Sequence, residues 1–184
     1  MTDNLDKLWE LTGVTREEYK DAYYGFFDPV GLILSKELAW GGGYWSTPVN
    51  TVSFGRTGGD GIHFSFLKEK DDISNESPIV MTLPSADTSN IIVGESLIDF
   101  LSLGCRAGYF ELGQVEYRLK EHIPFMESKQ YPPDYDDENI NRLKLIEKGF
   151  DISPWNEIIE KLAKLNEKYI GKLMYSEEYY EITT

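Results

Sequence analysis

The stretch GRTGGDGIHFSF, residues 55–66, carries the side chains that could most readily do chemistry in this sequence. It holds Arg56, Asp60 and His63, which is one of only two histidines, among four glycines. An aspartate this close to a histidine could orient the imidazole as a general base. A small hydrolase or transferase that uses these three residues is therefore one hypothesis. The glycines allow two others, a phosphate-binding loop and a tight turn between strands.

The residues after the glycines favour the turn. A phosphate-binding loop needs a following helix whose N-terminus meets the anion. Here the glycines are followed by IHFSF, which alternates as a strand does, and by no lysine. Two alternating segments joined by a Gly- and Asp-rich connection predict a β-hairpin. Ser65 shares a face with His63, but no glycine-flanked elbow presents it as a nucleophile.

No metal ion or cofactor is expected. The second histidine, His122, is distant from His63 in the sequence, and no carboxylate or thiolate is patterned beside the two. Cys105 follows an apolar segment, which predicts a buried small residue and not a reactive thiol. A non-enzymatic function is therefore our first hypothesis, and the hydrolase or transferase is its alternative.

Hydrophobic periods and capping signals predict the elements around this stretch. Helices are expected at 3–11, 15–27, 28–39, 94–105, 108–119, 138–150 and 153–173, and a linker at 129–139. Strands are expected at 47–55, 61–67, 77–84 and 90–94. In the second strand, Ile62, Phe64 and Phe66 should face the core, while His63 and Ser65 should face solvent.

This order of elements predicts an α+β fold, with helices flanking a small, mostly antiparallel sheet of about four to six strands, one face of which is wet. The predicted organisation is an α+β domain over residues 1–127. A helical C-terminal extension, residues 128–184, is expected to pack on the same domain.

Charge and composition limit the class of partner. The 184 residues carry a formal net charge of −14, which would repel nucleic acid and anionic membranes and attract a basic partner. A single cysteine excludes an internal disulfide, and no apolar run reaches the roughly 18 residues of a membrane span. With no signal-peptide pattern at the N-terminus, a cytoplasmic location is expected.

Aromatic residues near a triple glycine suggest an interface. Trp40, Tyr44 and Trp45 lie in the segment WGGGYW and supply the rigid contact area that protein interfaces use. We expect these three residues to contact a partner, together with the acidic or polar residues Asp60, His63, Asp71, Asp72 and Glu76.

Three segments resemble the SUKH superfamily, which includes Syd, the fungal cell-wall synthesis regulators and immunity proteins of bacterial toxin systems. They are NTVSFGRTGGDGIHFSFL, SPIVMTLPS and NIIVGESLIDFLSLGC. The shared pattern is a strand, a Gly-Asp turn, an alternating strand, further strands and a short helix. The family's Asn-Gly-Gly stretch has its nearest counterpart in LAWGGGYW, which lacks the asparagine, and the chain from about residue 128 has no counterpart.

The resemblance implies a non-enzymatic α+β binding domain. Immunity members bind and block a toxin, often a nuclease. A nuclease is basic around its substrate channel, so an acidic protein could cover it through charge complementarity. The expected function is therefore a protein-binding module that neutralises a basic, nuclease-type toxin. A regulatory domain with an unknown partner is a further alternative.

Overall fold

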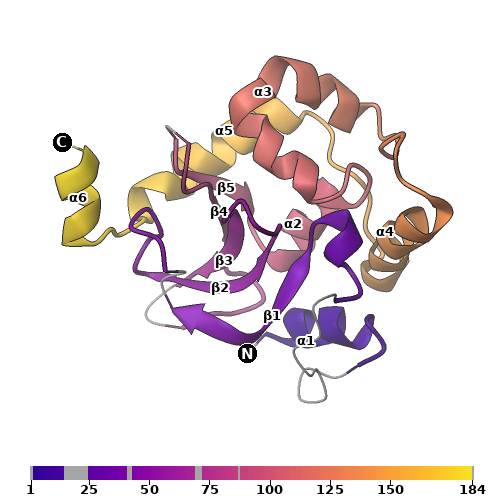
Figure 1. Ribbon diagram of the computed structural model, residues 1–184, viewed down its shortest axis with the longest axis horizontal. Coiled ribbons are helices and arrows are strands. Elements are labelled where there is room, and N and C mark those ends of the chain that lie inside the picture. The colour runs from indigo at the N-terminus through magenta and orange to yellow at the C-terminus, as the bar shows by residue number, and fades with distance from the viewer. Residues whose placement is uncertain (1, 15–24, 41–42, 69–71, 87, 184) are drawn as a thin grey trace.

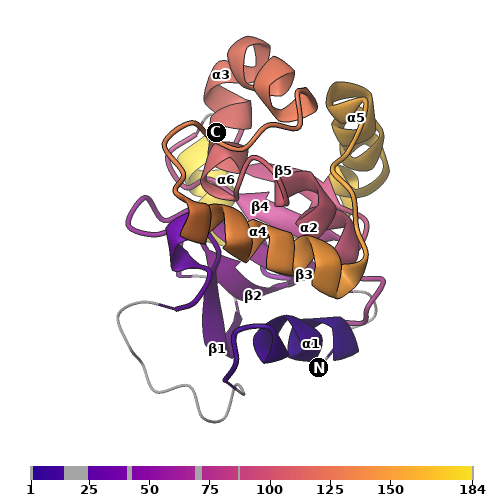
Figure 2. The same cartoon turned by 90° about the vertical axis from the view of Figure 1, so that its right-hand side faces the viewer.

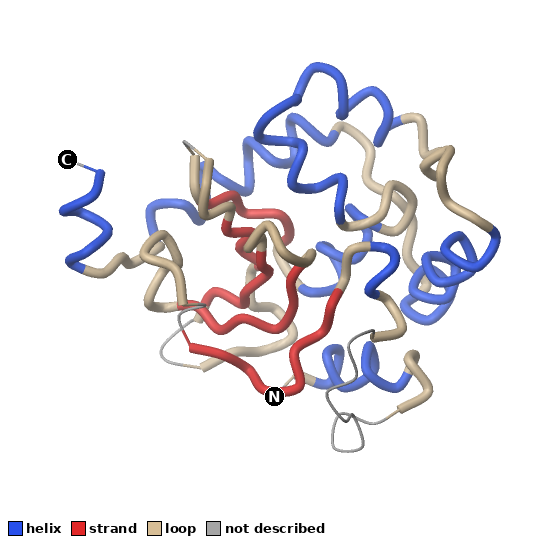
Figure 3. Tube along the Cα trace, viewed as in Figure 1, coloured by secondary structure: helices blue, strands red, loops and turns tan. Residues whose placement is uncertain are grey.

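The computed structural model describes residues 2–14, 25–40, 43–68, 72–86 and 88–183, with backbone only at 39–40 and 117–120. Its centre is an antiparallel sheet in the order β1-β2-β3-β4-β5 (Figures 1 and 3). The strands are β1 (Ile33–Trp40), β2 (Thr51–Arg56), β3 (His63–Leu67), β4 (Ile79–Thr82) and β5 (Asn90–Gly94). Helices flank this sheet, so the predicted α+β class is confirmed.

The helix predicted at 28–39 is wrong, because most of this segment is strand β1. Asp28 and Pro29, read as a helix start, open only the short 3-10 helix η1 (Asp28–Val30). Gly31 then adopts a left-handed conformation with φ of 81°, which ends the turn, and the chain continues as an edge strand. A further helix, predicted at 15–27, falls mostly outside the described residues.

The hairpin predicted for residues 55–66 is confirmed. Strands β2 and β3 pair antiparallel, with Arg56 opposite His63, and the connection is closed by a hydrogen bond from the Thr57 N–H to the Ile62 carbonyl at 3.0 Å. Strand β2 also carries an irregularity between Ser53 and Gly55. Such a bulge re-aims the side chains that follow it.

Helix α2 (Leu97–Gly104) covers one face of the sheet and builds an aromatic core there. The Phe100 ring lies 4.7 Å from Phe64, 5.2 Å from Tyr109 and 5.9 Å from Phe54, measured between centroids. All four side chains are fully buried. As predicted, Phe64 therefore faces the core. Helix α1 (Asp3–Glu10) adds Leu5 and Leu8 to the same core, which confirms the amphipathic helix expected at 3–11.

After residue 105 the described chain contains helices and connections but no strand. It forms α3 (Phe110–Glu127), α4 (Asp137–Phe150), α5 (Ile158–Tyr169), η2 (Ile170–Lys172) and α6 (Glu177–Thr183). Leu143 of α4 and Leu162 of α5 join the core that β2 and β3 build, so residues on both sides of position 128 share one core. Figures 1 and 2 show α4 beside α2, with α6 on the opposite side of the sheet.

The last long helix begins later than predicted. Ser153 and Pro154 were expected to start it, but α5 begins at Ile158, after Glu157 in a left-handed conformation. The Trp155 indole donates a hydrogen bond to the Asp99 carbonyl instead, at 3.0 Å. Trp155 therefore links the segment that precedes α5 to helix α2.

The prediction that one face of the sheet is wet fails at His63 and Ser65, although Arg56 on the same face is exposed. His63 and Ser65 point away from the aromatic core, as expected, but the exposed fractions of these residues are 6% and 0%. The residues that cover this face come from the loop 44–50 and from the C-terminal segment. This packing joins positions that are distant in the sequence, so a strand's own alternation could not reveal it.

Asn166 of α5 caps the free edge of β5. Its Oδ1 accepts the Ile92 N–H at 3.0 Å, and its Nδ2 donates to the Ile92 carbonyl at 3.3 Å. We expect Asn166→Ala to lower the free energy of unfolding by about 1–3 kcal/mol, because Ile92 is buried and both backbone groups lose their partner. Denaturant unfolding checks this. Asn166→Asp, which keeps only the acceptor, should be intermediate, and an unchanged midpoint for the alanine variant would contradict the edge role.

Candidate functional site

An open groove of about 480 Å³ lies on the face of the sheet opposite the aromatic core. The register places Arg56 between Ile33 of β1 and His63 of β3, so these three side chains share that face. The pairing of β1 with β2 is irregular between Leu34 and Ala39, where the register shifts. The groove is lined by Ile33, Ser35, Tyr44, Ser53, Gly55, Arg56, Gly58, Gly59, Gly61 and His63. We call it the sheet groove.

Hydrogen bonds engage both ring nitrogens of His63. Nδ1 lies 2.8 Å from the Gly61 carbonyl oxygen, and Nε2 lies 3.1 Å from the Thr47 hydroxyl. A carbonyl can only accept, so Nδ1 carries the proton of the neutral imidazole and Nε2 accepts from Thr47. The Tyr44 ring stacks on the imidazole, with centroids 5.7 Å apart and planes at 16°. His63 therefore links the β2–β3 turn to the loop 44–50.

Burial lowers the pKa of His63 below its ordinary value of 6.5, and the bond to the Gly61 carbonyl opposes this only in part. As the pH falls below 6.5, His63 becomes protonated in the unfolded chain. In the folded chain it stays neutral until the pH approaches its lower pKa. The free energy of unfolding therefore decreases with falling pH across this window, by at most about 1.4 kcal/mol per pH unit.

We expect His63→Gln to remove this dependence. The unfolding free energy of the wild type minus that of the variant should shrink between about pH 7 and about pH 5. Urea unfolding at several pH values measures it. A constant difference would contradict a neutral, buried His63.

The Asp60–His63 dyad of the alternative hypothesis is not assembled. The Asp60 Oδ1 accepts the Thr57 hydroxyl at 2.7 Å and the Ile62 N–H at 3.1 Å, which is the pattern of an aspartate that stabilises its own turn. Within the described residues, no hydrogen bond joins Asp60 to His63, and Asp60 does not line the sheet groove. Of the three residues of the hypothesis, the structure brings together Arg56 and His63.

A buried polar layer lies beside His63 on the same face of the sheet. The Ser53 and Ser65 hydroxyls are 2.7 Å apart, and the Thr82 hydroxyl donates to Asn90 Oδ1 at 2.8 Å. Asn90 Nδ2 in turn donates to the Ser46 carbonyl at 2.9 Å. These bonds hold the loop 44–50 against the sheet. Of these residues, Ser65 was expected to face solvent because it alternates with apolar residues along its strand, whereas no prediction was made for Thr82 or Asn90.

The loop 44–50 also binds the C-terminal segment. The Val49 N–H donates to the Met174 carbonyl at 2.7 Å, and the Asn50 side chain accepts the Met174 N–H and donates to the Lys172 carbonyl, both at 2.9 Å. The Trp45 ring lies 5.8 Å from Tyr179 of α6. Residues 44–50 thus pack against residues 170–183, and we call the two segments together the C-terminal platform. Figure 1 labels its last element, α6.

Exposed apolar side chains concentrate on this platform. Among the described residues, ten large apolar side chains are exposed, and six of them lie here: Tyr44, Val49, Ile170, Met174, Tyr180 and Ile182. The other four, Val14, Phe26, Phe110 and Ile159, are scattered over other elements. An exposed apolar gathering of this kind typically marks an interaction surface.

The remaining predicted contact residues are dispersed. Trp45 and Tyr44 lie on the platform, whereas Trp40 ends β1 and its side chain is outside the described part of the chain. Asp72 and Glu76 are exposed in the loop before β4, whose Asn75 accepts the Asn4 N–H of α1 at 3.1 Å. Asp71 lies outside the described residues. Sequence reasoning missed Met174, Tyr180 and the acidic residues of α6 as parts of the surface.

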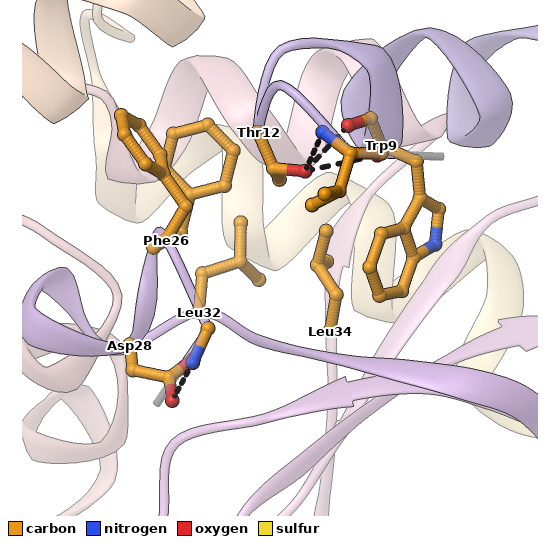
Figure 4. Close-up of a pocket in the computed structure, with 9 residues that line it drawn as sticks. Trp9, Thr12, Phe26, Asp28, Leu32 and Leu34 are labelled. Atoms are coloured by element: carbon orange, nitrogen blue, oxygen red, sulfur yellow. Dashed lines mark hydrogen bonds between the residues drawn. The ribbon is translucent and has the colours of Figure 1, made fainter. Parts of the chain in front are cut away.

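A second, smaller pocket lies between α1 and β1 (Figure 4). Its space is about 20 Å³, and Trp9, Phe26, Leu32 and Leu34 supply apolar walls. Asp28 accepts the Gly25 N–H there at 2.5 Å. Burial raises the pKa of this carboxyl, although the Gly25 bond and the Arg56 charge oppose the shift. The space suits a water molecule and no larger ligand.

Two further groups that could react or bind a metal ion, Cys105 and His122, each contact a neighbouring residue. Cys105 is buried, as predicted, its Sγ donates to the Ser102 carbonyl, and burial raises its pKa to about 12. His122 pairs with Glu111 at 2.8 Å. Within the described ranges, no group of three or more His, Cys, Asp or Glu residues is placed to hold a metal ion. None of the helices described has the length and apolar character needed to cross a bilayer.

Comparison of the chain with models of known protein families, with curated proteins and with solved structures finds no match. The resemblance to the SUKH superfamily therefore stays a hypothesis that rests on the sequence pattern alone.

Proposed function

We propose that this protein is a non-catalytic binding module that uses the C-terminal platform to bind a basic protein, in the manner of an immunity protein covering a nuclease-type toxin. The observation that carries the proposal is the platform itself, where six of the ten exposed large apolar side chains of the described residues gather. Apolar and aromatic anchors of this kind dominate binding energy at protein interfaces.

Charge complementarity selects the class of partner. Helix α6 presents the exposed residues Glu177, Glu178 and Glu181, and the only basic residue between 170 and 183 is Lys172. The Lys172 ammonium lies 4.7 Å from the centroid of the Tyr169 ring. An acidic margin around apolar anchors favours a basic surface, and the net charge of −14 accelerates its approach.

The platform is held in place before any partner arrives. Tyr175 and Tyr179 stack with centroids 3.9 Å apart, and the Tyr175 hydroxyl lies 3.4 Å from Asn90 Nδ2 in the buried polar layer. Together with the backbone bond between Val49 and Met174, these contacts reduce the ordering cost of binding.

The hydrolase or transferase alternative receives less support. A general base at His63 would have to give up the Thr47 hydroxyl at Nε2, and Asp60 would have to leave its turn. A regulatory domain would use the same platform with a different partner, so that alternative differs from our proposal in the partner's identity and not in the surface.

Co-purification from host extract tests the proposal. Tagged wild-type protein should retain one basic protein at stoichiometric level, and moderate salt should weaken the retention. The double variant Val49→Ser/Met174→Ser should lose this protein. The matched control Val14→Ser/Ile159→Ser removes two apolar side chains that are also exposed, but away from the platform, and should retain it.

The purified partner should have nuclease activity that the wild-type protein blocks and the platform variant does not. Retention of nothing, or equal retention by both double variants, would contradict the proposal. A retained partner without nuclease activity would contradict the toxin assignment and leave the binding surface standing.

A further inference from the structure

The lining of the sheet groove carries a positive charge, whereas the protein as a whole is acidic. The guanidinium of Arg56 is the groove's one cationic side chain, and no carboxylate is among its ten lining residues. Asp60 accepts two hydrogen bonds within the turn. Asp28 accepts the Gly25 N–H and interacts electrostatically with Arg56, but it does not line the groove. Arg56 is exposed, and no hydrogen bond or ion pair holds it within the described part of the chain.

The groove also has a flat aromatic wall. The Tyr44 ring packs nearly parallel to the buried His63 imidazole, which fixes the tyrosine's orientation, while 44% of Tyr44 remains exposed. A planar apolar group can stack on a ring held in this way. The guanidinium and this aromatic wall line the same space.

Gly58 and Gly59, in the turn between β2 and β3, keep the groove open. No atom lies within 4 Å of the position a Cβ would take at Gly58 or Gly59, so their backbone borders empty space. Their N–H groups donate no hydrogen bond within the residues described, which leaves donors available to a bound oxygen.

We propose that the sheet groove binds a small planar carboxylate, with the carboxylate on Arg56 and the planar group against Tyr44. A guanidinium presents two parallel N–H donors that match one carboxylate. The single cation balances a monoanion, whereas a dianionic phosphate would require further cations or a helix N-terminus, and strand β3 follows the glycines here. The inference does not depend on the partner proposed for the C-terminal platform.

Titration with benzoate, followed by NMR of the backbone amides, tests the proposal. Benzoate should shift the amide signals of Gly58, Gly59 and Gly61 saturably. Acetate should bind more weakly because it lacks the ring. Benzamide, which is uncharged, and inorganic phosphate should each leave these signals nearly unchanged.

Two variants examine the charge and the space separately. Arg56→Gln should weaken benzoate binding by about tenfold or more, because the charge-assisted bonds are lost. Gly59→Val should weaken it as strongly by filling the groove, without altering any charge. The matched controls are Lys148→Gln, an exposed cation on α4, and Gly171→Val, where a Cβ also meets open space. Both should bind benzoate as the wild type does.

Four results would overturn the proposal. They are the absence of saturable shifts up to the solubility limit of benzoate, equal binding of benzamide, equal or tighter binding of phosphate, and undiminished binding by Arg56→Gln or Gly59→Val. Because Arg56 and Gly59 are exposed and lie outside the platform, failure here leaves the co-purification result unaffected.

Discussion

Replacing Phe100 by alanine is expected to lower the free energy of unfolding by about 3–5 kcal/mol. Phe100 is fully buried at the junction of α2 with β2 and β3, and its ring contacts those of Phe54, Phe64 and Tyr109. Truncation removes a large buried apolar surface, leaves a cavity and breaks three aromatic contacts at once. Chemical denaturation followed by tryptophan fluorescence measures the change.

Phe110→Ala provides the matched control, because the same substitution is made at a side chain that is 43% exposed. Its effect should stay within about 1 kcal/mol, as is usual for exposed positions. Equal losses for the two variants would contradict the placement of the core between α2 and the sheet.

Reversing the charge of α6 should have the largest effect on partner binding. In the triple variant Glu177→Lys/Glu178→Lys/Glu181→Lys, the association rate with the basic partner should fall by about one to two orders of magnitude at low salt. The acidic margin of the platform then repels the partner instead of attracting it. Stopped-flow or surface-based kinetics at several salt concentrations measure this, and the difference should shrink as salt rises.

The control for this variant reverses three exposed acids elsewhere, Glu10, Glu121 and Asp134. It changes the net charge equally, so it separates a local effect from a global one. Equal slowing by both triple variants would show that the platform has no special role in the approach of the partner.

The fold class was predictable from the sequence because the periods of several elements are unambiguous. Alternation in IHFSF and the apolar face of residues 3–11 identified β3 and α1 correctly. The helix predicted over β1 was wrong because the set Val30, Leu32, Ile33, Leu34 and Leu38 fits a helical period, although all of these residues except Ile33 also fit an alternating one. Gly31 was the overlooked signal: its left-handed φ of 81° ends the turn that Asp28 and Pro29 begin.

The candidate site was predicted only in part. The hairpin and its aspartate turn follow from local chemistry, so they could be read from residues 55–66. The cover over His63 could not, because it comes from Thr47 and Tyr44 and, through Asn90, from Tyr175. The C-terminal platform likewise depends on Asn50 binding the backbone of residues 172 and 174, a long-range contact that no local pattern encodes.

The most direct test of the binding proposal is a hydrogen-exchange footprint of the complex recovered by co-purification. We predict that the partner slows amide exchange in residues 44–50 and 170–183, and most clearly in α6, which buries no side chain in the free protein. Protection confined to the hairpin turn 57–62 or to the loop 72–76, with the platform unchanged, would contradict the assignment of the C-terminal platform as the partner-binding surface.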